Sequence, residues 1–185
     1  MKKAVWRLYF DYEKEEKWLN DMAAKGLAFE DYYFGRYLFS DSEPGEYIYR
    51  LELLENHSRN PESQKYLSFM AETGAEPVAT WLRWVYFRKR ASDGPFELYS
   101  DIDSKIAHFR RIMWLFFPIM ILELLIGISN ISIGLPYLHG QIHDSSPFNF
   151  VVGIICVCIG IALFFPFNHA RIKVKKLRQD KLLLE

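Results

Sequence analysis

The chain has 185 residues, half of them apolar and a quarter charged, with 23 basic and 23 acidic side chains. This length fits one domain, alone or with an appendage, and the balanced charge argues against a protein built to bind nucleic acid. The charged residues are unevenly distributed along the chain, because Glu123 and Asp144 are the only ones between positions 112 and 168. The sequence therefore predicts a water-exposed N-terminal part followed by a membrane part.

The first hundred residues alternate between strand and helix patterns. Asp11 is placed to cap a first helix, and Asn60-Pro61 is typical of the start of a second one. The order strand, helix, strand, strand, helix, strand is the split βαβ pattern of a ferredoxin-like fold. We therefore expect an α+β cytoplasmic domain of ferredoxin-like βαββαβ topology over residues 1–100. Its elements are predicted over residues 4–10, 11–26, 27–39, 46–55, 60–74 and 77–89.

One face of such a sheet carries both helices, and the other is open. Alternation along residues 46–55 predicts Tyr47, Tyr49, Leu51 and Leu53 for the covered face. The opposite positions mix charge with large apolar side chains, which is typical of a surface that binds a partner. Alternatively, residues 92–100 fold over this face. The predicted partner surface consists of Arg50, Glu52, Trp81, Arg83, Val85 and Phe87.

Two long apolar segments follow, over residues 112–135 and 148–167. A helix needs about 20 residues to cross a hydrocarbon core about 30 Å thick, so each segment is long enough to span a bilayer. Buried helices of a soluble protein are the alternative, but these are usually shorter and carry a polar stripe. We therefore expect a transmembrane hairpin, with a juxtamembrane helix over residues 101–111 that continues into the first span.

The distribution of basic residues orients this hairpin. The connector over residues 136–147 contains no Lys or Arg, whereas Lys105, Arg110 and Arg111 precede the first span. Because basic flanks stay on the cytoplasmic side, we expect a multi-pass protein of the cell membrane with both termini cytoplasmic and an extracytoplasmic loop. The basic tail over residues 168–185 is expected to bind anionic lipid. Its lipid-binding residues are Arg171, Lys173, Lys175, Lys176, Arg178 and Lys181.

Glu123 is the charged residue within the apolar segments. It lies 11 residues into the first segment, about 16 Å deep at 1.5 Å per residue and therefore close to the midplane. A carboxyl at this depth is costly, which makes Glu123 a candidate functional residue. The alternative is a neutral carboxyl that forms a packing contact between helices. In a hairpin it would lie opposite residues 156–160.

The sequence lacks motifs that would indicate catalysis or cofactor binding. The sequence has no phosphate-binding loop, zincin motif or nucleophile elbow, so we expect no enzymatic activity and no cofactor. His139 and His143 in the connector lack a helix that would present them to a metal, and Cys156 and Cys158 project apart on a helix. Residues 1–111 hold 17 basic and 19 acidic side chains, so nucleic acid is not an expected partner.

Four segments, over residues 11–26, 44–55, 74–89 and 94–105, cover most of the predicted cytoplasmic domain. Together they resemble the DUF2812 family, a group of bacterial membrane proteins of unknown function that is widespread in Gram-positive species. The resemblance implies apolar spans after the domain and a link to a PadR-type transcriptional regulator, because relatives are often encoded beside one. It implies no catalytic residue.

Two hypotheses follow for the function. The first is a membrane-anchored, non-enzymatic interaction or regulatory module whose cytoplasmic domain binds a protein partner, linked through the resemblance to a PadR-type regulator. The alternative is a small transport or envelope-stress component that oligomerises through its transmembrane helices, with Glu123 at the interface. The expected partners are the lipid bilayer and a protein partner or a second copy of the chain.

Overall fold

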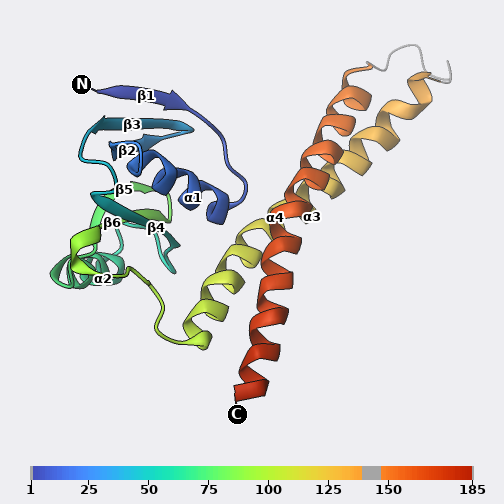
Figure 1. Cartoon of the computed structure of the whole chain (residues 1–185). Coiled ribbons are helices and arrows are strands. Elements are labelled where there is room, and N and C mark those ends of the chain that lie inside the picture. Colours follow the sequence, from blue (N-terminus) through green and yellow to red (C-terminus); the bar gives the residue numbers. More distant parts are fainter. Residues whose placement is uncertain (1, 139–146, 185) are drawn as a thin grey trace. The chain divides into compact units, whose positions relative to one another are not determined.

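The computed structural model describes residues 2–138 and 147–184. The chain forms two compact units, which divide between Asp101 and Ile102 (Figure 1). The first unit contains six strands in two sheets together with helices, and the second consists of two long apolar helices. The predicted α+β class with a C-terminal helical hairpin is confirmed.

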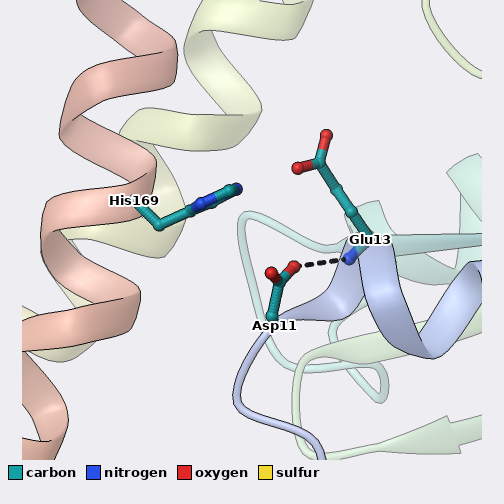
Figure 2. Close-up of side chains that lie close together, drawn as sticks. All are labelled: Asp11, Glu13 and His169. Atoms are coloured by element: carbon teal, nitrogen blue, oxygen red, sulfur yellow. Dashed lines mark hydrogen bonds between the residues drawn. The ribbon is translucent and has the colours of Figure 1, made fainter.

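The helices of the first unit begin where their caps predict. Asp11 Oδ1 accepts a hydrogen bond from the backbone N–H of Glu13 at 3.1 Å (Figure 2). Asn60 Oδ1 accepts one from the backbone N–H of Glu62 at 2.9 Å. Both contacts satisfy donors that the first helical turn leaves unpaired. The elements are β1 (Lys3–Trp6), α1 (Tyr12–Ala23), β2 (Leu27–Tyr33), β3 (Arg36–Asp41), β4 (Tyr47–Leu53), α2 (Pro61–Glu72), β5 (Glu76–Trp81) and β6 (Trp84–Arg90).

The strand count corrects the ferredoxin-like prediction. The two longest predicted strands are each a hairpin, with turns at Phe34-Gly35 and Leu82-Arg83. Phe34 and Leu82 have φ angles of 42° and 56°, in the left-handed region that residues other than glycine rarely adopt. Neither turn contains Asn-Gly or Pro, and both lie within aromatic segments. The sequence therefore lacks the usual signal of a hairpin turn at these positions. Instead of one four-stranded sheet there are two antiparallel sheets, ordered β1-β3-β2 and β4-β6-β5.

The first unit is built from two copies of one βαββ motif. In each copy the first strand pairs with the last strand of the hairpin. Gly74 follows Gly26 by 48 positions, and Leu82 follows Phe34 by the same interval; all four residues have positive φ. The β-bulges repeat at this spacing too, between Phe29 and Asp31 and between Pro77 and Ala79. We call residues 3–41 the first repeat and residues 47–90 the second repeat.

Two apolar clusters form the core of the first unit. One packs α1 and the first sheet against one face of the second sheet, and includes Leu19, Tyr37, Leu51 and Tyr86. The other packs α2 against the opposite face of the second sheet. The second sheet is therefore buried on both faces. This second cluster consists of Leu54, Leu67, Met70, Ala75, Val85, Phe87 and Phe96.

The second unit is a pair of antiparallel helices, α3 (Ile102–Leu138) and α4 (Phe148–Leu184), which lie side by side in Figure 1. Each has 37 residues, about 55 Å of helix, which exceeds the thickness of a hydrocarbon core. Both are long and apolar enough to cross a membrane. The predicted juxtamembrane helix and first span are one continuous helix, and the tail continues α4.

Glycines allow these helices to approach closely. A Cβ atom on Gly127 would lie 2.9 Å from the backbone oxygen of Gly153, and one on Gly153 would lie 2.8 Å from that of Gly127. Only a residue without a side chain fits at such a distance. Within the predicted extracytoplasmic loop, residues 139–146, including His139, His143 and Asp144, lie outside the described residues.

Candidate interaction site

Half of the predicted partner surface is interior. Val85 and Phe87 have no exposed surface, and Glu52 is 3% exposed. Their side of the second sheet is covered by α2 and by Phe96, so the prediction of an open face at these residues is wrong. The alternative, that residues 92–100 fold over this face, is confirmed for Phe96 and for Leu98, which packs against the same cluster.

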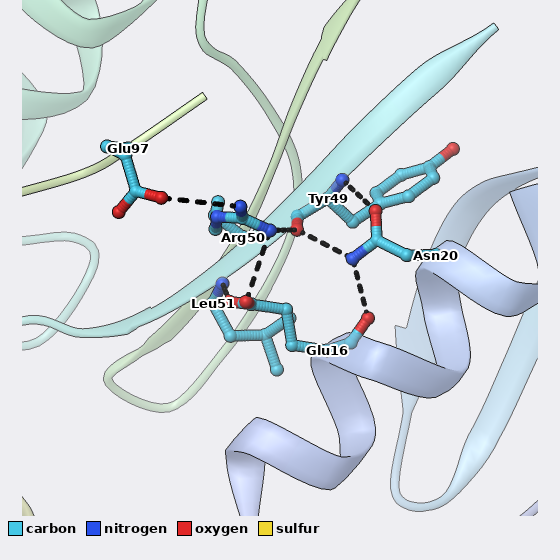
Figure 3. A network of polar contacts seen from close by, with 6 residues as sticks. All are labelled: Glu16, Asn20, Tyr49, Arg50, Leu51 and Glu97. Atoms are coloured by element: carbon cyan, nitrogen blue, oxygen red, sulfur yellow. Dashed lines mark hydrogen bonds and ion pairs between the residues drawn. The ribbon is translucent and has the colours of Figure 1, made fainter. Parts of the chain in front are cut away.

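The other three predicted surface residues lie at the edges of the second sheet. Arg83 Nε donates to the backbone oxygen of Leu54 at 2.9 Å, which ties the β5–β6 turn to the end of β4. Arg50 pairs with Glu16 at 3.2 Å and with Glu97 at 3.8 Å (Figure 3). Trp81 is partly exposed.

Side chains of α1 close the free edge of β4. The Asn20 amide accepts from the backbone N–H of Tyr49 at 2.9 Å and donates to the carbonyl of Tyr49 at 3.0 Å (Figure 3). The Glu16 carboxylate accepts from the backbone N–H of Leu51 at 2.9 Å. Burial raises the pKa of Glu16, while the Leu51 hydrogen bond and Arg50 act against that rise. Because these groups occupy its donors and acceptors, this stretch of β4 is blocked from pairing with another strand.

A buried carboxyl joins the two repeats. Glu15 Oε1 accepts hydrogen bonds from the hydroxyls of Tyr37 in the first repeat and Tyr86 in the second, both at 2.6 Å. Burial raises the pKa of Glu15, and the two hydrogen bonds offset part of that rise. Burial beside this carboxyl also raises the pKa of both tyrosines. All three side chains are buried and bonded to one another, an arrangement that suits a structural link rather than catalysis.

The open face of this unit belongs to the first sheet. Trp6 in β1 and Tyr33 in β2 both lie opposite Arg36 in β3, so these three side chains form a row across the sheet. Trp6 is 70% exposed and Tyr33 66%, and Arg36 is exposed as well. Within the described part of the first unit, no helix covers this row. The open face consists of Ala4, Trp6, Asp31, Tyr33, Arg36 and Leu38.

The hairpin turns extend this face toward the second repeat. The ring of Tyr33 lies 5.1 Å from that of Trp81, and the ring of Phe34 lies 6.2 Å from Trp81. Phe34 and Leu82 are mostly exposed at the two turns. Trp81, which sequence reasoning placed on the partner surface, therefore borders the open face, whereas Trp6, Tyr33 and Arg36 were missed. Recognising the turn at Phe34-Gly35 would have placed Tyr33 and Arg36 on neighbouring strands.

In the second unit, Glu123 meets a partner within the same chain. Its carboxyl is a hydrogen-bond partner of the Cys156 thiol on α4. The neighbouring Leu124 packs on Gly160, where an added Cβ would come within 2.8 Å of its side chain. This region of α4 is the one expected opposite Glu123. The contact gives the carboxyl one partner inside the hairpin.

The predicted lipid-binding residues of the tail lie on α4 in different environments. Lys181 Nζ pairs with Asp103 on α3 at 2.7 Å, which joins the ends of the hairpin farthest from the connector. Lys173 lies over the ring of Phe109, 5.9 Å from its centroid. The remaining four are exposed, namely Arg171, Lys175, Lys176 and Arg178.

Comparison with known proteins identifies the class of the chain. The family described as "Protein of unknown function (DUF2812)" matches residues 11–121, from the Asp11 cap into the apolar part of α3. The chain belongs to the DUF2812 family. No curated protein and no solved structure matches it.

Proposed function

We propose that this chain is a membrane-anchored, non-enzymatic interaction module whose N-terminal unit binds a protein partner in the cytoplasm through the open face of the first sheet. The observation that carries the proposal is the exposed row of Trp6, Arg36 and Tyr33. Trp, Arg and Tyr are the residue types that most often dominate the binding energy of protein interfaces. The same face of the second sheet, by contrast, is packed into the core.

Membrane anchoring is supported by the two helices, each long and apolar enough to span a bilayer. The positive residues that flank both spans support a cytoplasmic N-terminal unit. Replacement of Ser145 by Cys, in a chain with Cys156 and Cys158 changed to Ser, tests this topology. We expect an impermeant maleimide to label this residue in intact cells, and a Lys176→Cys chain only after lysis. The reverse pattern would contradict the proposed orientation.

Partner binding is tested by a photo-cross-linking amino acid placed at Tyr33 in cells. Phe69 provides the matched control, because it is an exposed aromatic residue of the same unit on the outer side of α2. We expect a discrete cross-linked protein from position 33 and none from position 69. Arg36→Glu should abolish the cross-link, since it reverses the charge in the centre of the row.

Identical cross-linking patterns at positions 33 and 69 would show random collision and count against the proposal. A cross-linked species of twice the mass of the chain would identify a second copy as the partner. Recovery of a PadR-type regulator at position 33 would support the regulatory link that the family resemblance implies.

The alternative, an oligomeric transport or envelope-stress component, has less support, because Glu123 already has a partner in Cys156. It predicts that Glu123→Leu reduces the oligomeric mass of the detergent-solubilised chain. Our proposal predicts the same mass for the wild type and for this variant, measured by light scattering.

A further inference from the structure

A groove of about 600 Å³ lies between α3 and α4, at one end of the apolar segments. It is formed by side chains of the second unit alone. Among the described residues that line it, four are cationic and none is acidic. The lining residues that matter here are Arg110, Trp114 and Phe117 on α3 and Phe167, Arg171 and Arg178 on α4; Lys175 supplies the fourth cation.

The lining changes character along the helices. Phe117 and Phe167 lie within the apolar segments, and their rings are 5.5 Å apart. Arg110 and Arg171 lie one or two turns beyond them toward the charged end, about 10 Å and 6 Å along their helices. Trp114 stands between these levels on α3, at the position where aromatic side chains favour the membrane interface. One end of the groove is thus suited to hydrocarbon and the other to an anion.

The cationic end is suited to phosphate in particular. An Arg guanidinium donates two parallel hydrogen bonds to a phosphate, and it stacks on aromatic rings more readily than an ammonium does. Arg110 from one helix and Arg171 from the other present such groups to the same groove. A phosphate bound there would be held by both helices, while an attached acyl chain would lie along Phe117 and Phe167.

We infer that this groove binds an anionic phospholipid of the cytoplasmic leaflet, with its phosphate on Arg110 and Arg171 and an acyl chain on the two phenylalanines. The inference rests on the proposed membrane topology but not on partner binding by the N-terminal unit. It differs from general attraction of a basic tail to the membrane, because it assigns lipid binding to some tail cations and not to others.

Two other occupants fit less well. Free inorganic phosphate would leave the apolar half of the groove unused. A second copy of the chain, joined through the same face, would bring four further cations against these four, and like charges across an interface are unfavourable. The gradient from apolar to cationic lining therefore favours a molecule that has both an anion and a hydrocarbon chain.

The experiment uses the full chain purified in detergent, with bound lipids counted by native mass spectrometry after addition of phosphatidylglycerol or phosphatidylcholine. We expect the wild type to retain phosphatidylglycerol preferentially. Arg110→Gln together with Arg171→Gln should weaken this retention about a hundredfold, since each change removes a hydrogen bond to a charged group and each such bond accounts for about tenfold. The control is Lys105→Gln together with Lys176→Gln, which removes the same charge from the same helices outside the groove.

Equal loss of phosphatidylglycerol in both double variants would overturn the inference and leave only general electrostatic attraction. Equal binding of the two lipids by the wild type would overturn it as well, as would displacement of the lipid by millimolar inorganic phosphate. Should the Gln variant fail to fold, Arg110→Lys with Arg171→Lys keeps the charge and is still expected to weaken retention. Failure of the wild type to insert into lipid nanodiscs would instead contradict the proposed topology.

Discussion

The two repeats of the N-terminal unit share one topology but use their sheets differently. In the second repeat, the row Leu53, Trp84 and Trp81 lies across the sheet, and Leu53 has no exposed surface. The matching row in the first repeat is Trp6, Arg36 and Tyr33, and it is exposed. A duplicated motif can bury the outer face of one copy against the other copy, but the outer face of the remaining copy stays unpaired. That asymmetry is the physical basis of the proposed partner site.

The largest expected difference between the repeats concerns this row. Leu53→Ala should lower the free energy of unfolding by about 3 kcal/mol, because it removes a fully buried side chain and leaves a cavity. Trp6→Ala at the matching position should change it by less than about 0.5 kcal/mol, as is usual for surface substitutions. Urea unfolding of the full chain in detergent, followed by tryptophan fluorescence, measures both. Similar losses in the two variants would mean that the face of the first sheet is covered.

The carboxyl that joins the repeats gives the next largest effect. Glu15→Leu would leave the buried hydroxyls of Tyr37 and Tyr86 without their acceptor, at a cost of about 2 kcal/mol. Glu15→Gln keeps an oxygen at this position and cannot ionise. We therefore expect the Gln variant to be at least as stable as the wild type at neutral pH in the same unfolding experiment.

The pH dependence of this contact has a defined sign. Because burial raises the pKa of Glu15 above its ordinary value of 4.5, its contribution to stability is present at lower pH and is lost as pH rises through the raised value. The advantage of Glu15→Gln over the wild type should therefore grow from pH 4.5 upward and then level off. An advantage that shrinks with rising pH would show that the folded protein prefers the ionised carboxyl.

The side chains that close the edge of β4 give a smaller expected difference between the two repeats. Asn20→Ala removes two hydrogen bonds to the backbone of Tyr49 and should cost about 1 kcal/mol. The matching position in α2 is Ser68, which is exposed, so Ser68→Ala should have almost no effect. Hydrogen exchange at the amide of Tyr49, followed by mass spectrometry of peptides, should quicken in the first variant alone. Unchanged exchange would mean that a different group protects this edge.

The sequence predicts the features of this fold that depend on neighbouring residues better than those that depend on tertiary packing. The caps at Asp11 and Asn60 act through contacts two residues away, and both are present as predicted. The helical hairpin follows from length and apolar composition. The predicted partner surface failed because the strand pattern shows which residues alternate but not which face a helix will cover. The alternation alone therefore could not show that Val85 and Phe87 are buried.

The repeat itself left a signal in the sequence. Lys17-Trp18-Leu19 with Met22-Ala23 and Gly26 matches Lys65-Tyr66-Leu67 with Met70-Ala71 and Gly74, each 48 positions later. Aligning these two helices would have shown that the segments after them are equivalent, but it would not have revealed the hairpin in each. It would not have given the open face, because that depends on which repeat packs onto which.

The smallest predicted effect concerns the two turns that escaped sequence reasoning. Phe34 and Leu82 hold left-handed backbone angles, which cost an ordinary residue about 1 kcal/mol relative to glycine. Both side chains are mostly exposed, so a change to glycine loses little packing. We therefore expect Phe34→Gly and Leu82→Gly each to raise stability, by up to about 1 kcal/mol. If Phe34→Gly also weakens the cross-link at Tyr33, the strained residue contributes to binding at the expense of stability, as is common at functional sites. If Phe34→Gly instead lowers stability, the side chain of Phe34 contributes to the packing around Trp81.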